Sequence, residues 1–390
     1  METKRDGLFN YHPLSDRERK NIAILELIRK DGPISRAEIS RITDINVVSV
    51  SSYIKSYIDA GLVTEKGLDE SSGGRRPELI ELNKKDIYVI GLSLNSSRIS
   101  GSLVGIDMNV IKKANALYDR PSPEDSLSII SGVIDDLLKT PGVTSKSVKA
   151  IGIGVPHNNF IFLRDGIEKK FGIPVFAGND ASCAVFGEKM MNPVADVADL
   201  LYMYSDVGCG IVVRGDIYLG SGGSAGEMQI SNMHISKEEE AVLLRDSRYL
   251  KPWGNYLGIT SAAKREIERG VGTKMVAIAR GEINNVTKEV VIEAARQNDE
   301  VASYIIQDAA VNLGIRIAYL VNLFNPEVVV IGGGIEKAGE LILNPIIDKV
   351  KKFAFSAQAN MVKIIPSVLG DDAVSLGAAS LAVREVFLRA

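Results

Sequence analysis

The chain has 390 residues, of which 45% are hydrophobic and 24% charged, and a formal net charge of −3. These values are typical of a soluble globular protein, and a chain of this length is expected to form two or three domains. No apolar run reaches the roughly 18 residues of a spanning helix, so we expect neither a membrane span nor a secretory leader. Two cysteines are too few for a disulfide framework or a thiolate zinc site, and we expect a cytoplasmic protein.

The N-terminal part predicts a helix-turn-helix. After a polar arm, apolar residues at helical spacing predict a helix over 19–32, a short helix over 33–43 and a third helix over 46–63. Ser35 lies three residues before a glutamate, which is the spacing of a capping box, and Asn46 is the predicted N-cap of the third helix. Three helices of this order and length are typical of a helix-turn-helix.

The third helix has two different faces. Its predicted buried stripe consists of Val47, Val50, Ile54 and Ile58. The opposite face is small and hydroxylated and carries a lysine, which lets a helix approach the edges of bases closely. The candidate DNA contacts on this helix are Val48, Ser49, Ser51, Ser52 and Lys55. For an isolated amphipathic helix, a merely solvated face is the more common interpretation.

The following segment favours DNA binding. Two β-like runs, 62–67 and 78–83, predict a hairpin of the kind that forms the wing of a winged helix. Its tip carries two glycines followed by Arg75 and Arg76, which can clamp phosphates or enter a minor groove. Residues 1–85 hold 15 Lys/Arg and 14 Asp/Glu, so a DNA-binding surface requires its positive charge to be concentrated on one face. The alternative is a solvated loop.

From residue 87 onwards, predicted strands alternate with predicted helices, which is the pattern of an α/β protein. Strands are predicted over 86–94, 98–106, 148–156 and 173–178, and further strands and a long helix follow between 198 and 335. Three of the strand ends meet turns that contain glycine. Such turns are where α/β folds place ligands.

Taken together, these segments resemble the ROK family of sugar kinases and sugar-responsive repressors. The motifs that carry the resemblance are "AGLV" with "GGRRP" at 60–77, "GNDASCAVFGE" at 178–188, "GSAGEMQ" at 223–229 and "NPEVVVIGGGI" at 325–335. The resemblance implies a winged helix-turn-helix over 1–86 followed by a two-lobed actin/hexokinase-like domain. It divides that domain into an α/β lobe over 87–178, completed by a C-terminal helix over 371–390, and a second lobe over 179–370.

Several motifs depart from the pattern of the kinase members. The kinases open this domain with Asp-x-Gly-x-Thr, whereas this chain has Ser93-Leu94-Asn95-Ser96-Ser97, which lacks both the aspartate and the glycine. The second phosphate turn contains Asp206, which would repel a nucleotide. Phosphoryl transfer depends on positioning and charge neutralisation around the phosphate. We therefore expect a phosphate loop that no longer works, and no enzyme activity.

The zinc element of the family is also missing from the sequence. No cysteine follows Gln229, which stands where the family has a zinc-binding histidine, and the stretch offers a single histidine, His234. A structural zinc site needs about four nitrogen or sulfur ligands. We expect no metal and no cofactor.

The resemblance implies that Asn179, Asp180 and Glu227 contact the hydroxyl groups of a sugar, with Gln229 beside them. Two carboxylates and an amide can hold vicinal hydroxyls, so a sugar or polyol effector is expected. Another small molecule, or no ligand, is the alternative. In a kinase Asp180 would be the general base that activates the sugar hydroxyl. Without an anchored phosphate it is expected to be a ligand contact instead.

The sequence therefore predicts a DNA-binding transcriptional regulator, a repressor of carbohydrate-related genes, that binds a palindromic operator as a homodimer or a dimer of dimers. The first rival is an ATP-dependent ROK sugar kinase with an accessory DNA-binding segment, which Asp180 and the glycines at 332–334 favour. The second is a sugar-binding protein that acts without DNA, which leaves the wing unexplained.

Overall fold

The computed structural model describes residues 14–68, 78–95, 98–117, 123–156, 160–191, 197–204, 208–221, 223, 225–228 and 258–390. The chain divides into two compact units. The first unit comprises Met1–Gly187, Leu219–Ser224 and Val374–Ala390, and the second comprises Glu188–Tyr218 and Ala225–Ala373. Among the described helices, none combines the length and the apolar character that crossing a membrane requires.

The first unit begins with a winged helix-turn-helix, as the sequence predicts. It consists of α1 (Asp16–Asp31), β1 (Ile34–Ser35), α2 (Arg36–Thr43), α3 (Val47–Asp59), β2 (Val63–Leu68) and β3 (Glu78–Leu82). The strands form an antiparallel sheet of order β1-β3-β2. The first helix starts earlier than predicted, because Ser15 and Glu18 form a complete capping box that satisfies its first N–H groups.

The predicted caps of α2 and α3 are confirmed. The Ser35 hydroxyl accepts a hydrogen bond from the N–H of Glu38 at 3.2 Å, and the Asn46 side chain accepts one from the N–H of Ser49 at 2.8 Å. The predicted buried stripe of α3 is partly wrong. Residues 50, 54 and 57 are buried, whereas Val47 is 48% exposed. The buried residues are spaced by four and three positions, which keeps them on one face of the helix.

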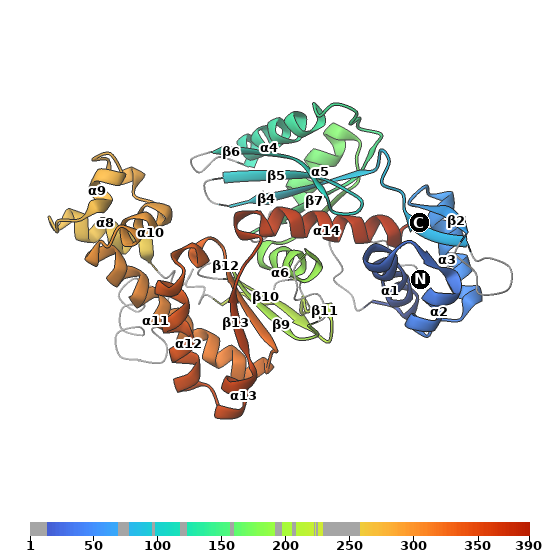
Figure 1. Ribbon diagram of the computed structural model, residues 1–390. Helices are drawn as coiled ribbons and strands as arrows, with labels where there is room; N and C mark the ends of the chain where they lie inside the picture. Colours follow the sequence, from blue (N-terminus) through green and yellow to red (C-terminus); the bar gives the residue numbers. More distant parts are fainter. Residues whose placement is uncertain are drawn as a thin grey trace. The chain divides into compact units, whose positions relative to one another are not determined.

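The rest of the first unit is a five-stranded sheet covered by helices on both faces (Figure 1). The strands are β4 (Tyr88–Leu94), β5 (Arg98–Gly105), β6 (Val110–Leu117), β7 (Val148–Val155) and β8 (Val175–Asn179), in the order β6-β5-β4-β7-β8. The helices α4 (Pro123–Leu138) and α5 (Phe160–Phe171) pack on one face around a core that includes Ile90, Leu92, Ile134 and Ile151. The C-terminal helix α14 (Ala373–Leu388) packs on the other face.

Helix α14 approaches its neighbours closely because glycines line the contacts. A Cβ at Gly91 of β4 would lie 1.9 Å from the carbonyl oxygen of Ser375, so only glycine fits there. On its other side α14 meets α6 (Asp180–Met191), where a Cβ at Gly377 would lie 1.7 Å from the carbonyl oxygen of Cys183. The hydroxyls of Ser102 and Ser375 share a hydrogen bond of 3.0 Å beneath the sheet. Helix α14 is therefore held in a fixed position between the sheet and α6.

This close contact makes Gly377 sensitive to substitution. Gly377→Ala is expected to lower the free energy of unfolding by about 1–3 kcal/mol, because the added methyl group must push α14 away from α6. Gly132 of α4 is the matched control, since a Cβ there meets nothing within 4 Å. Gly132→Ala is expected to be neutral or stabilising by about 0.5–1 kcal/mol. Denaturant unfolding of both variants tests this, and equal effects would contradict the tight contact.

The second unit repeats the topology of the first sheet. Its strands are β9 (Leu200–Tyr204), β10 (Gly208–Val213), β11 (Asp216–Ile217), β12 (Val328–Gly332) and β13 (Lys363–Pro366), in the order β11-β10-β9-β12-β13. In both sheets an antiparallel meander of three strands is followed by two parallel strands. This duplication confirms the two-lobed α/β architecture expected from the sequence.

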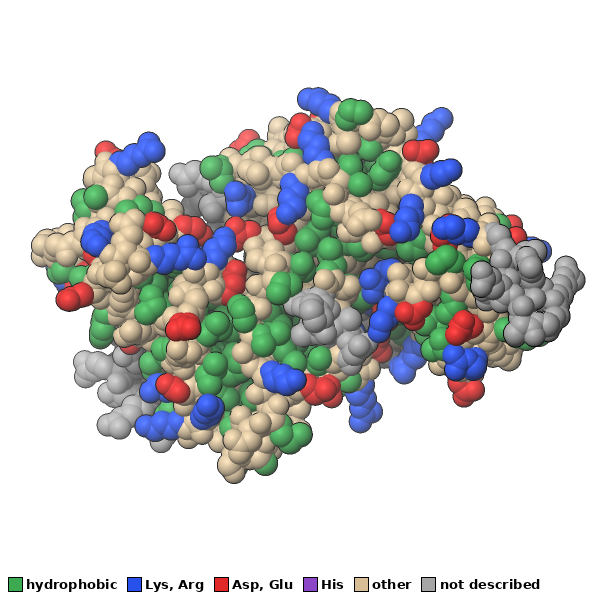
Figure 2. Space-filling view, in the orientation of Figure 1, with side chains coloured by type: hydrophobic (Ala, Val, Ile, Leu, Met, Phe, Trp, Pro, Cys, Tyr) green, Lys and Arg blue, Asp and Glu red, His purple; other side chains and the backbone are tan. Residues whose placement is uncertain are grey.

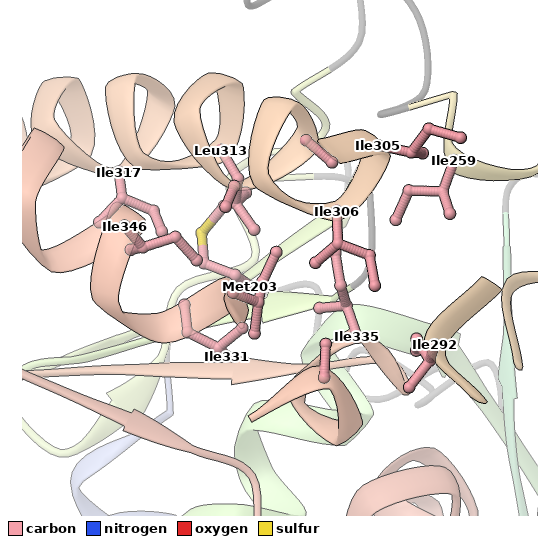
Figure 3. Close-up of a cluster of buried hydrophobic side chains, with 14 of the residues drawn as sticks. Met203, Ile259, Ile292, Ile305, Ile306, Leu313, Ile317, Ile331, Ile335 and Ile346 are labelled. Atoms are coloured by element: carbon pink, nitrogen blue, oxygen red, sulfur yellow. The ribbon is translucent and has the colours of Figure 1, made fainter. Parts of the chain in front are cut away.

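The core of the second unit lies between its sheet and the long helix α11 (Glu300–Phe324), which is accompanied by α12 (Glu340–Phe353). Figure 3 shows Met203 and Ile331 of the sheet against Ile306, Leu313 and Ile317 of α11. In the described part of this unit the other helical elements are α8 (Ile259–Glu268), α9 (Lys274–Ile278), η3 (Ile283–Asn285), α10 (Lys288–Arg296), η4 (Ile335–Ala338), α13 (Ser356–Met361) and η5 (Gly370–Asp372).

Candidate nucleic-acid interface and effector site

Helix α3 presents a solvent-facing surface with the composition that the sequence predicts. Val48 is 76% exposed, and Ser52 and Lys55 are exposed one and two turns further along the helix. Ser49 and Ser51 are half-buried beside this stripe. The five predicted α3 contacts are thus on or beside one accessible strip. Their contact with DNA remains a prediction.

The turn between α2 and α3 is fixed by local hydrogen bonds. Asp44 ends α2 in the left-handed conformation with φ 55°, and the buried Ile45 follows it. The Ser40 hydroxyl donates to the carbonyl oxygen of Ile45 at 2.6 Å, and the Thr43 hydroxyl donates to that of Ile39 at 2.6 Å. These contacts set the direction in which α3 leaves the turn.

The stem of the wing is tied to the helix-turn-helix by an arginine that sequence reasoning missed. Arg36, the first residue of α2, forms ion pairs with Glu65 of β2 at 2.6 Å and with Glu78 of β3 at 3.3 Å. One cation thus bridges both strands of the wing. The predicted contacts Arg75 and Arg76 lie outside the described residues.

Charge is mixed over one face of the molecule. On the face shown in Figure 2, lysine and arginine side chains are interspersed with aspartate and glutamate. This mixture agrees with the net charge of −3. Neither this face nor the net charge indicates a strongly positive field.

A buried junction, which no pattern in the sequence indicates, joins the winged helix to the C-terminal helix. Tyr57 of α3 and Phe387 of α14 are both fully buried, with ring centroids 5.0 Å apart in an edge-to-face arrangement. The Tyr57 hydroxyl donates to the Oδ1 atom of Asn21 at 2.7 Å, and the Asn21 Nδ2 atom donates to the carbonyl oxygen of Phe387 at 3.2 Å. Burial raises the pKa of the Tyr57 hydroxyl, which keeps it protonated as a donor.

Two of the predicted effector contacts lie together in the first unit. Asn179 ends β8 and Asp180 begins α6, and both side chains are buried. The Asn179 side chain accepts from the N–H of Ser182 at 3.0 Å, and the Asp180 carboxylate accepts from the N–H of Ala181 at 2.7 Å. These bonds place both polar groups at the N-terminus of α6.

The other predicted effector contact in the described part of the chain belongs to the second unit. Glu227 is half-buried and pairs with Gly208 in an isolated antiparallel bridge. The adjacent Gly226 has φ 94°, and its carbonyl oxygen accepts from the N–H of Cys209 at 2.8 Å. The segment is thereby fixed against β10. Gln229 lies outside the described residues.

The first turn that would hold phosphate in a kinase is closed by its own side chain. The Asn95 Oδ1 atom accepts from the N–H of Arg98 at 2.8 Å, and the N–H of Asn95 donates to the carbonyl oxygen of Arg98 at 3.0 Å. Ser96, Ser97 and Asp206 lie outside the described residues, as does His234. Among the residues that are described, no three His, Cys, Asp or Glu side chains gather as a metal site would require.

The glycine turn after β12 is occupied by side chains of the second unit. The Lys288 ammonium group donates to the carbonyl oxygen of Gly333, and Lys337 pairs with Asp371 at 2.6 Å. Glu336 is buried beside them, and desolvation raises the pKa of its carboxyl group, opposed by backbone hydrogen bonds and by Lys288. The ammonium groups of Lys288 and Lys337 therefore both have partners within the protein at this turn.

Comparison with protein families identifies the two parts of the chain. The model of the ROK family matches residues 125–240 and 260–385, and a model described as winged helix-turn-helix DNA-binding matches residues 17–64. The chain belongs to the ROK family. The resemblance seen in its motifs is thereby confirmed.

Named relatives and solved structures match between about three quarters and nearly all of the chain. The putative xylose repressor of Caldicellulosiruptor sp. is 32% identical over 94% of this chain and 95% of its own length. The crystal structure of a ROK family transcriptional regulator, described as a homolog of the E. coli MLC protein, covers 96% of this chain and 98% of its own, with a TM-score of 0.73 and 23% identity. A ROK family glucokinase from Streptomyces griseus covers 76% of this chain and 99% of its own, with a TM-score of 0.61 and 22% identity. At these identities the two structures show the fold alone, and the winged helix rests on the family match over residues 17–64.

Proposed function

We propose that this ROK protein is a DNA-binding transcriptional repressor of carbohydrate-related genes, controlled by a sugar or polyol bound to its kinase-like domain. The observation that carries the proposal is the buried junction of Asn21, Tyr57 and Phe387, which connects α3 to the sensor lobe. The ROK relative named putative xylose repressor supports the same function. A winged helix that was only an appendage would not need a buried polar contact of this kind.

DNA recognition follows from the accessible strip of α3. The N-terminal residues of a recognition helix meet base edges in the major groove, where Val48, Ser49, Ser51 and Ser52 would lie. Lys55, Arg75 and Arg76 would contact phosphates or the minor groove. Two copies related by a two-fold axis, as a homodimer or a dimer of dimers, would bind a palindromic operator.

The effector contacts expected from the family motifs are Asn179, Asp180, Glu227 and Gln229. Two amides and two carboxylates suit the vicinal hydroxyls of a sugar. The name of the xylose-repressor relative makes a pentose the first effector to test. The effector acts by binding one conformation more tightly than the other, which shifts the population of DNA-competent protein.

The signal has a continuous path within the first unit. Helix α6 begins at Asp180, and one turn later the carbonyl oxygen of Cys183 lies against Gly377 of α14. Helix α14 then runs to Phe387, which contacts Tyr57. Because these contacts are close-packed, a shift of α6 on binding the effector is transmitted to the packing of α3.

Phosphoryl transfer is not part of this proposal. Ser93 stands where the kinases have the metal-binding aspartate, and Asn95, in place of their glycine, bonds within its own turn. A general base at Asp180 would have no positioned phosphate to receive the attack. The rival function, an ATP-dependent sugar kinase, predicts ADP formation from ATP and a sugar that is lost in Asp180→Asn.

Asp180→Asn is also the test of the effector site. The variant is expected to require at least about tenfold more sugar than the wild type to release operator DNA, because a hydrogen bond to a charged group is lost. Fluorescence anisotropy of a labelled operator, titrated with xylose and other sugars, measures this release. Asp135→Asn on exposed α4 is the control and should behave as the wild type. Equal sugar responses of wild type and Asp180→Asn would contradict the assigned site.

A further inference from the structure

The recognition helix begins in an apolar patch that the fold does not use. Over residues 14–66, the exposed large hydrophobic side chains are Ile42, Val47 and Val48, at 49%, 48% and 76% exposure. All three flank the turn that joins α2 to α3. Other residues of the same helices, including Ile39, Val50 and Ile54, form the buried core of the domain. Val48 therefore lies mostly outside the packing of the winged helix, and Val47 and Ile42 are only partly packed.

These residues are also unfavourable choices for an exposed helix start. Valine has lower helix propensity than alanine or the charged residues that usually occupy such positions. Exposing a valine side chain to water does not stabilise the fold, so nothing offsets this lower helix propensity. A partner that buries the patch would explain it, and the winged helix already places this end of α3 where a recognition helix meets bases.

The major groove has one apolar group, the C5-methyl of thymine. From Val48 towards the C-terminus, the exposed strip of α3 changes from apolar to hydroxyl at Ser52 and to cationic at Lys55. This order matches a helix whose first turn contacts methyl groups, whose middle contacts polar base edges and whose far end contacts phosphate. The β-branched valine has few accessible χ1 rotamers, so its methyl groups lose little conformational freedom when they contact a base.

We infer that Val48 contacts thymine C5-methyl groups, and that Val47 and Ile42 extend this apolar surface, so that each operator half-site contains a thymine at a fixed position. The inference rests on the proposed DNA-binding function and adds the base chemistry that the site recognises. Ser52 and Lys55 do not take part in reading this methyl group.

Deoxyuridine tests the inference, because it differs from thymidine only by the methyl group. The duplexes contain the operator that the purified protein selects from genomic DNA fragments. Each thymine is replaced by deoxyuridine in turn, at the same position of both half-sites. The affinity of the protein for each duplex is measured by fluorescence anisotropy at a fixed salt concentration. At the contacted position the wild type is expected to lose about fourfold in affinity per methyl, the factor that corresponds to burying one methyl-sized group. Val48→Ala should bind the thymine and deoxyuridine duplexes equally at that position.

The control variant is Ser52→Ala, on the same exposed strip. It should bind the operator more weakly yet keep the wild-type sensitivity to deoxyuridine. If the wild type selects an operator but no deoxyuridine substitution lowers its affinity, the inference fails and the proposed function stands. If wild type and Val48→Ala lost the same affinity on the deoxyuridine substitution, another residue would contact the thymine methyl group. That result would overturn the role of Val48. If the protein selects no sequence, the proposed function itself fails.

Discussion

Tyr57→Phe is expected to lower the free energy of unfolding by about 1–3 kcal/mol and to weaken the release of operator DNA by the effector. The variant keeps the aromatic ring against Phe387. It removes the hydroxyl that donates a hydrogen bond to the Asn21 Oδ1 atom at 2.7 Å. The Asn21 side chain, which is buried, then loses one of its hydrogen bonds. Denaturant unfolding and the sugar concentration that releases half of the operator measure the two effects.

Tyr53→Phe provides the matched control. Tyr53 lies one turn earlier in α3, and its hydroxyl also donates to α1, to the carbonyl oxygen of Arg17 at 3.0 Å, but outside the buried junction. Its loss should cost less than about 1 kcal/mol and leave the effector response unchanged. If Tyr53→Phe and Tyr57→Phe reduced the effector response equally, the junction would have no special role in transmission.

Phe387→Ala removes the other side of the junction. A buried phenylalanine replaced by alanine typically costs about 3–5 kcal/mol, so this variant is useful only if it remains folded. In a folded sample the winged helix should still bind DNA, whereas the effector should release it poorly. Full release by the effector would contradict the path through α14.

The double variant Arg75→Ala/Arg76→Ala is expected to have the largest effect on DNA binding. Four guanidinium groups are lost from a dimer, so the slope of log affinity against log salt should fall by about 3–4 if each of them contacts a phosphate. Affinity at physiological salt should fall roughly tenfold or more, because these contacts position the protein without regard to sequence. The measurement is operator affinity at several salt concentrations.

Lys139→Ala is the control for this double variant. Lys139 is an exposed cation just after α4, away from the winged helix in sequence. It should leave both the affinity and the salt slope unchanged. An unaltered salt slope in Arg75→Ala/Arg76→Ala would remove the two arginines from the interface.

Local sequence signals predicted the winged helix well. The caps at Ser35 and Asn46 and the apolar spacing of the helices are short-range features, so they can be read directly from the chain. The exposure of Val47 was missed because a helical stripe shows which residues share a face but not where the core ends. The early start of α1 was missed because the Ser15 capping box lies in a polar segment.

Long-range contacts were beyond what the sequence could indicate. Asn21 and Phe387 are 366 residues apart, and no periodicity relates them. The ion pairs of Arg36 with two strands of the wing depend on how the hairpin folds back. The candidate effector residues were proposed from the family motifs, since a buried Asn-Asp pair alone would also fit a capped helix start.

The central claim, that the chain reads a specific DNA sequence, is tested most directly by selecting genomic DNA fragments with the purified full-length protein at physiological salt. We predict enrichment of a discrete palindrome whose half-sites are separated by whole turns of the DNA helix, about 10–10.5 base pairs apart or a multiple of that. Binding that falls with salt but enriches no sequence would contradict the claim.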